Sequence, residues 1–107
     1  MRKSVYTQSN MTIFEWDENK AESNLQKHKV SFEEARTIFD DEFLITFLDE
    51  LHSIDEQRFI SIGYSKTNRI LLAVHLQHSK NIDDILIRII SCRKATALER
   101  EIYEKQE

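Results

Sequence analysis

The sequence contains one glycine, one cysteine and no proline among its 107 residues. The single glycine, Gly63, excludes the glycine-rich loops that bind phosphates in nucleotide-binding proteins. The single cysteine, Cys92, excludes an intrachain disulfide and is typical of a reducing compartment, so we expect a cytoplasmic protein. No apolar run approaches the roughly 20 residues of a membrane-spanning helix, and no apolar segment follows Arg2 and Lys3 as in a signal peptide. The length predicts a single domain. The lack of a long apolar run predicts that the protein has no membrane partner.

Charge is unevenly distributed along the chain. The net charge is −4, but residues 15–56 hold 13 acidic and 4 basic side chains, a net charge of −9. Residues 57–107 hold 9 basic and 6 acidic side chains, a net charge of +3. This asymmetry predicts one positive face, although solvated charged faces on both halves explain it equally well.

The residue pattern predicts an α+β domain over residues 12–107, preceded by a flexible leader over residues 1–11. Four β-rich segments are joined by short polar breaks, which predicts an antiparallel meander. We expect a short strand at 12–16, helices at 18–28 and 32–39, strands at 43–48, 58–65, 70–77 and 85–93, and a helix from 97 to about 105.

Capping signals mark the starts of the three expected helices. Asp17 suits an N-cap, and Ser31 with Glu34 reads as a capping box in which each side chain bonds the other residue's backbone. Thr96 with Glu99 reads as a second capping box.

Metal and thiol chemistry find little support. The sequence has four histidines, His28, His52, His75 and His78, and their spacing is not that of a zinc site. No cofactor is implied. Cys92 precedes Arg93, which would stabilise a thiolate, but the more common role of such a residue is a small buried apolar group.

The last predicted strand carries more positive charge than a buried strand tolerates. Arg88 and Arg93 flank its second half, and Arg100 and Tyr103 follow on the capped helix. A buried guanidinium must be paired or face solvent, and arginine binds phosphate with two parallel hydrogen bonds. We therefore expect an anion site at this strand–helix junction.

Metal-free cleavage of RNA needs a base for the 2′-hydroxyl, cations for the phosphorane and an acid for the leaving oxygen. Arginines suit the second role, and the candidates for base or acid are His28, His75, Glu99 and Tyr103. Each candidate also has a structural interpretation. Arg58 and Arg88 could pair with helix acids, Tyr103 could pack its helix on the sheet, and His28 could stabilise a helix end.

Several motifs in order resemble the BrnT family of toxins over residues 13–104. They are Phe14-Glu15-Trp16-Asp17-Glu18, Asn24-Leu25-x-Lys27-His28-x-Val30-Ser31-Phe32-Glu33-Glu34-Ala35, Phe39-Asp40-Asp41, Glu56-x-Arg58-Phe59-x-x-Ile62-Gly63 and Arg88-Ile89-Ile90-Ser91-x-Arg93-x-Ala95-Thr96-x-x-Glu99-Arg100-x-x-Tyr103. The family commonly has glycine where this chain has Lys29, and often alanine where it has Cys92.

The resemblance implies a RelE-like fold and a type II toxin, a metal-independent endoribonuclease that inhibits translation. A cognate BrnA-type antitoxin, expected to have a ribbon-helix-helix fold, would neutralise it and bind operator DNA. On this basis the catalytic candidates are Arg88, Arg93, His28 and Tyr103, and the RNA-binding candidates are Arg58, Lys27, Arg100 and His75.

Two other functions stay open at this stage. A degenerate toxin would act mainly as an antitoxin-binding co-repressor module, with the acidic half of the chain docking a basic antitoxin segment. A plain RNA-binding domain is disfavoured by the acidic balance, because RNA affinity depends on cations.

Overall fold

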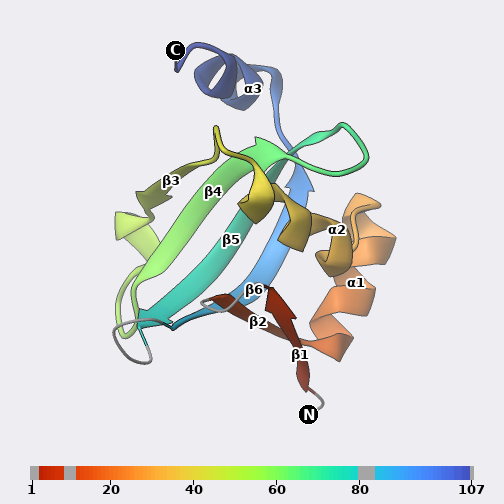
Figure 1. The fold of residues 1–107 in the computed structure, drawn as a ribbon, viewed down its shortest axis with the longest axis vertical. Coiled ribbons are helices and arrows are strands. Elements are labelled where there is room, and N and C mark those ends of the chain that lie inside the picture. Colours follow the sequence, from red (N-terminus) through yellow and green to blue (C-terminus); the bar gives the residue numbers. More distant parts are fainter. Residues whose placement is uncertain (1–2, 9–11, 80–83, 107) are drawn as a thin grey trace.

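The chain folds into one six-stranded sheet with helices packed against it (Figure 1). The computed structural model describes residues 3–8, 12–79 and 84–106. The strands are β1 (Lys3–Gln8), β2 (Thr12–Asp17), β3 (Ile45–Leu48), β4 (Arg58–Tyr64), β5 (Ile70–Ser79) and β6 (Ile85–Lys94). The helices are α1 (Glu18–His28), α2 (Phe32–Arg36) and α3 (Ala97–Glu104), with 3₁₀ turns η1 (Thr37–Asp40) and η2 (Glu50–His52). The predicted α+β class is confirmed.

The sheet is mixed, with strand order β1-β2-β6-β5-β4-β3. Strands β3 to β6 form the predicted meander, because each pairs antiparallel with the next. Strand β2 lies parallel to β6, from Thr12 opposite Ile85 to Glu15 opposite Arg88. The first predicted strand is therefore present, and it places the start of the domain beside the last strand.

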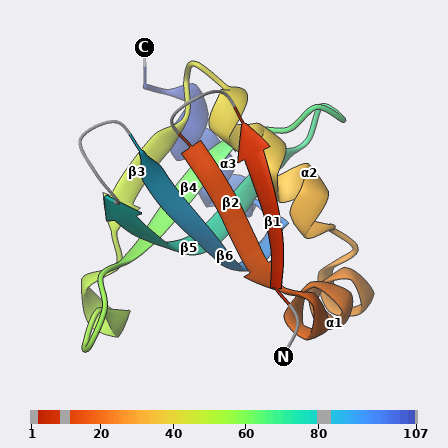
Figure 2. The ribbon, with the colours of Figure 1, turned by 60° about the horizontal axis from the view of Figure 1, so that its bottom comes forward.

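The structure differs from the expected leader at the N-terminus. Residues 3–8 form β1, which pairs antiparallel with β2 along its whole length. Figure 2 shows β1, β2 and β6 side by side at this edge of the sheet. Residues 1–2 and 9–11 lie outside the described residues. An edge strand is defined by backbone pairing, so a polar segment without alternation carries little signal for it.

The first helical segment agrees with the sequence, and the second is shorter than predicted. The side chain of Asp17 caps α1 by accepting from the Asn19 amide at 2.9 Å. The segment predicted as one helix over 32–39 is instead α2 followed by the tighter turn η1. In η1 the Asp41 amide donates to the Ile38 carbonyl at 3.0 Å, an i→i+3 bond.

Half of the capping box predicted at Ser31 is wrong. Ser31 Oγ does accept from the Glu34 amide at 3.0 Å. The Glu34 carboxylate turns away from the helix start and accepts from Arg69, Thr67 and Ser65 of the β4–β5 turn. The hydrogen bond from Arg69, helped by those from the two hydroxyls, lowers the pKa of Glu34 to about 2 despite burial. A stronger, charge-assisted partner outcompetes the helix backbone.

The core lies between one face of the sheet and helices α1 and α2 (Figure 1). Its largest fully buried side chains include Phe14 and Trp16 of β2, Phe32 of α2 and Ile38 of η1. Gly63 allows η1 to approach β4, because a Cβ there would lie 3.1 Å from the Ile38 carbonyl oxygen. Among the described residues, no helix has the length and apolarity needed to cross a membrane.

A buried asparagine closes the edge of β6 where β2 ends. The pairing with β2 stops at Arg88, so within the described residues the second half of β6 has no strand on that side. There the amide of Asn24 donates to the Cys92 carbonyl at 2.9 Å, and its oxygen accepts from the Cys92 amide at 3.1 Å. It also donates to the Val30 carbonyl at 3.0 Å. The side chain thus replaces a neighbouring strand for one residue of β6 and fixes α1 against the sheet.

Lys29 occupies a position that favours glycine. It ends α1 in the left-handed conformation, with φ 62° and ψ 30°. We expect Lys29→Gly to raise the free energy of unfolding by roughly 0.5–1 kcal/mol, because a side chain strains this conformation. Urea denaturation measures the effect. The matched control is Lys20→Gly within α1, which should destabilise the protein by a similar amount; equal destabilisation by both variants would contradict the prediction.

His75 makes stability depend on pH. It is fully buried, and burial lowers the pKa of its ring to about 4. Between pH 4 and 6.5 the unfolded chain binds a proton that the folded chain does not, so stability must fall as the pH falls through this range. We expect a loss on the order of 1–3 kcal/mol. Urea titrations at about pH 7, 6 and 5 should show the free energy of unfolding falling with pH for the native sequence. For His75→Gln the fall should be smaller.

Candidate active site

Two of the predicted arginines lie in one row across the face of the sheet opposite the core. Arg58 of β4 is opposite Leu76 of β5, and Leu76 is opposite Arg88 of β6. Alternation along the strands directs all three away from the core, because their neighbours Phe59, His75 and Ile87 pack on the other side. The two arginines are two strands apart, which is about 10 Å. We call this surface the open face.

The two arginines of this row differ in their partners. Arg88 Nη1 lies 3.1 Å from Glu15 Oε2 of β2, so its partner comes from a strand and not from a helix. Arg58 forms no side-chain hydrogen bond or ion pair in the described part of the chain, and its Nε is buried without an acceptor. A partly buried cation without an anion is costly in a folded protein. Arg58 is therefore the cation of this row that is available to a ligand.

A short loop holds a histidine beside Arg58. The Asp49 amide donates to the Arg58 carbonyl at 2.7 Å, which closes the β3–β4 connection. Inside it, Ser53 Oγ donates to the Asp49 carbonyl at 2.6 Å and accepts from the Arg58 amide at 2.9 Å. The turn η2 then presents His52, whose Nδ1 lies 2.9 Å from Asp49 Oδ2.

This pair fixes the form of the His52 ring. An ionised carboxylate can only accept, so Nδ1 carries the proton toward Asp49 and Nε2 is the ring nitrogen left for a substrate. His52 and Arg58 line one cavity of about 260 Å³, together with Ile54, Asp55, Glu56 and Leu76. A base oriented by a carboxylate, next to an unpartnered guanidinium, is an arrangement suited to phosphodiester cleavage.

Sequence reasoning missed His52. A signal was present, because Asp49 and His52 are three residues apart in a polar loop that leads directly to Arg58. The base or acid roles were assigned to His28 and His75, and the Asp49–His52 pair was left without a role.

Arg93 is occupied by the helix that follows it. Its Nη1 and Nη2 donate to the two carboxylate oxygens of Glu99 at 2.8 and 2.9 Å. The bond from Arg93 lowers the pKa of Glu99 to about 2. Glu99 also accepts from the Thr96 amide at 2.9 Å, which confirms the capping box predicted at Thr96. Arg93 thus holds α3 to the end of the sheet.

Tyr103 is held in the same way. Its hydroxyl donates to the carboxylate of Asp41, which also accepts from the backbone amides of Tyr64 and Phe43. Burial and this hydrogen bond raise the pKa of Tyr103. A phenol that donates to an aspartate is a poor proton donor for a substrate. Asp41 entered the sequence analysis only as part of the motif Phe39-Asp40-Asp41, and in the structure it ties α3 to the loop before β3.

Lys27 and His28 lie apart from the open-face arginines. They line a groove of about 330 Å³ between α1 and β6, with Asn24, Ile90 and Ser91 among its other residues. His28 ends α1, as its structural interpretation predicted.

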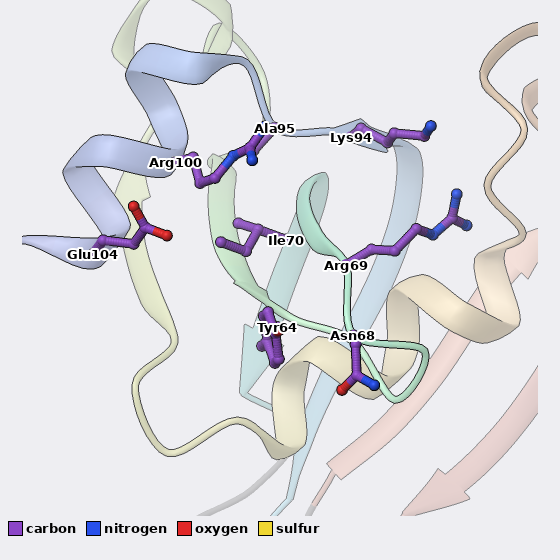
Figure 3. Close-up of a pocket in the computed structure, with 8 residues that line it drawn as sticks. All are labelled: Tyr64, Asn68, Arg69, Ile70, Lys94, Ala95, Arg100 and Glu104. Atoms are coloured by element: carbon purple, nitrogen blue, oxygen red, sulfur yellow. The ribbon is translucent and has the colours of Figure 1, made fainter.

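The remaining two candidates are also separated. Arg100 lines a cavity of about 350 Å³, and Figure 3 shows it and Glu104 on α3, while the side chains of Arg69 and Lys94 point away from them. His75 is wholly buried, with Nε2 2.8 Å from Ser61 Oγ and its ring stacked on Phe59. Its proposed contact with RNA is therefore not supported. Its alternation and apolar neighbours favour the core, and a neutral ring bonded to Ser61 is tolerated there.

The chemistry of Cys92 and of metals adds no second site. Cys92 is buried, and burial raises the pKa of its thiol to about 12, so the predicted inert role fits. The described residues contain no group of three or more His, Cys, Asp or Glu side chains placed to hold a metal ion.

Comparison with known proteins agrees with the architecture. A family model described as "Ribonuclease toxin, BrnT, of type II toxin-antitoxin system" matches residues 16–99. The crystal structure of the ribonuclease toxin BrnT from Brucella abortus superposes with a TM-score of 0.55 and 21% sequence identity. The match covers 81% of this chain and 99% of that chain, and at this identity it supports the fold alone. No curated protein sequence matches. Because the family model spans more than half of the chain, the protein belongs to the BrnT family of ribonuclease toxins of type II toxin–antitoxin systems.

Proposed function

We propose that this protein is an endoribonuclease that cleaves RNA without a metal ion and so inhibits translation in the cytoplasm. Family membership supports the ribonuclease class. The observation that carries the proposal further is the Asp49–His52 pair beside Arg58, in a cavity on the open face.

In the proposed reaction, His52 Nε2 accepts the proton of a ribose 2′-hydroxyl, whose oxygen attacks the adjacent phosphorus. Asp49 holds the ring and stabilises the imidazolium that forms. The guanidinium of Arg58 donates to the non-bridging oxygens, where charge accumulates in the phosphorane. The 5′-oxygen leaves as the bond to phosphorus breaks, and it takes a proton from the protonated ring or from water.

The other predicted site residues receive different roles in this proposal. Arg88, across Leu76 from Arg58, lies in the same row but is paired with Glu15, so it borders the RNA path and leaves Arg58 to bind the scissile phosphate. Arg93 and Tyr103 position α3 through Glu99 and Asp41. Lys27, His28 and Arg100 are too dispersed to share one phosphate with Arg58, since they line other cavities.

A type II toxin has an antitoxin partner, and this follows from the family. We propose a BrnA-type antitoxin with a ribbon-helix-helix fold, through which the toxin would reach operator DNA only indirectly. A co-repressor role of a weakly active toxin is the second candidate. The strongly acidic stretch over residues 40–56, which suits a basic partner better than RNA, favours it.

RNA cleavage by purified variants tests the proposal. We expect His52→Ala to lower the cleavage rate by about 10²–10⁴-fold, because it removes the base. Arg58→Ala should lower it by a similar factor through lost charge stabilisation. Rates are measured on a labelled RNA with EDTA present, and unfolding by urea checks that each variant is folded.

His28→Asn is the matched comparison, since it removes a histidine of the α1 groove. The proposal expects wild-type cleavage from it. Loss of cleavage in His28→Asn with full activity in His52→Ala would move the base to α1. Absence of cleavage by the native protein would leave the co-repressor role, and loss of activity in EDTA would contradict the metal-free reaction.

A further inference from the structure

Residues 42–56 form a surface that is both acidic and apolar, which we call the acidic edge. Residues 42–56 contain five acidic residues and no lysine or arginine. Five large apolar side chains of the acidic edge are exposed, namely Phe43 (58%), Phe47 (44%), Leu48 (39%), Leu51 (86%) and Ile54 (88%). Single exposed apolar residues are ordinary, but several on neighbouring elements mark an interaction surface.

The acidic edge includes a free strand edge. Strand β3 is the last strand of the sheet, with β4 on one side and no strand on the other within the described residues. Such an edge presents backbone N–H and C=O groups that an extended chain can pair with. The start of the edge is already used, because the Phe43 carbonyl accepts from the Gln106 side chain at 2.6 Å. The open part is therefore Ile45–Leu48.

Charge decides which partner fits. Glu42, Glu50, Asp55 and Glu56 are all exposed on the acidic edge. A second copy of this chain would bring the same negative charges against them. A nucleic acid lying along the edge would meet no lysine or arginine within residues 42–56, so an RNA phosphate finds a cation only at Arg58, beside the edge. An extended protein segment that alternates basic and apolar residues satisfies the charges, the apolar side chains and the strand edge together.

We infer that the acidic edge docks a basic, extended segment of the antitoxin, which adds to the sheet beside β3. This inference rests on the proposed function, in which the antitoxin is the partner. Ile54, Asp55 and Glu56 belong both to the acidic edge and to the cavity of His52 and Arg58. A segment bound along β3 and η2 therefore borders the catalytic cavity and restricts the access of RNA to it.

A synthetic peptide of roughly ten residues, with alternating lysine and valine, is the probe for this surface. Its binding to the full chain is followed by amide chemical shifts in NMR at low salt. We expect the largest shifts at Ile45–Leu48, saturable binding, and no binding of a peptide with glutamate in place of lysine.

Matched variants separate this surface from general attraction between opposite charges. Glu42→Lys with Glu50→Lys should weaken binding roughly tenfold or more, whereas Glu22→Lys with Glu33→Lys on α1 and α2 should change it less than about twofold. Leu51→Ser with Ile54→Ser should weaken binding, whereas Leu98→Ser on α3, also exposed at 66%, should not. All of these residues are exposed, so the variants are expected to fold.

Amide chemical-shift changes spread over the whole surface would overturn the inference. Equal losses of peptide affinity in the two charge-reversed double variants would also overturn it. So would a failure of the lysine–valine peptide to bind. Peptide binding is measured without RNA. If the peptide does not bind and the protein still cleaves RNA, this inference is wrong and the proposed nuclease function stands. Binding at Ile45–Leu48 by a protein without cleavage supports the docking surface and contradicts the nuclease. In a cleavage assay, the peptide should inhibit the native protein and not the Glu42→Lys, Glu50→Lys variant.

Discussion

The hydrogen bonds between the Asn24 side chain and the backbone of β6 are the interaction on which the arrangement depends. Strand β6 is central and carries Arg88 and Arg93, yet β2 supports only its first half. Where β2 ends, a strand would be left with unpaired backbone groups against α1. Asn24 satisfies the Cys92 amide and carbonyl and also the Val30 carbonyl after α1. The buried side-chain amide of Asn24 thus joins α1, the turn after it and β6, the strand that carries Arg88 and Arg93.

Pairing with carboxylates distinguishes the arginines that stabilise the fold from those that can bind a ligand. Arg69 is bound by Glu34, Arg88 by Glu15 and Arg93 by Glu99, and each pair joins two different parts of the fold. Arg58 has no such partner among the described residues. The positive charge of the last strand, β6, is therefore explained largely by folding. The chemistry is expected two strands away in the same row as Arg88, where Arg58 and His52 line one cavity.

The sequence allowed the main elements to be predicted because their signals are local. The meander, α1 with its Asp17 cap and the Thr96 capping box all depend on neighbouring residues. The pairing of β2 with β6 and the strand β1 depend on contacts between distant segments, and local pattern carries no register for them. The α+β fold shared with the BrnT structure is established, whereas the assignment to the RelE-like fold stays a prediction.

Site residues were harder to predict, because a charged residue's role depends on which partner reaches it. Glu34 looked like a capping residue and instead binds Arg69, 35 residues later. Arg93 and Tyr103 looked catalytic until Glu99 and Asp41 were seen to occupy them. His52 was overlooked, since its value comes from Asp49 and from the folded loop that brings it to Arg58.

Hydrogen exchange at the Cys92 amide in Asn24→Ala tests the central claim most directly. Asn24 is 7% exposed, and its truncation leaves the Cys92 and Val30 backbone groups without partners. The account predicts a loss of roughly 2–4 kcal/mol in the free energy of unfolding and much faster exchange at Cys92 than at its neighbours in β6. Wild-type stability with unchanged protection of the Cys92 amide would contradict it.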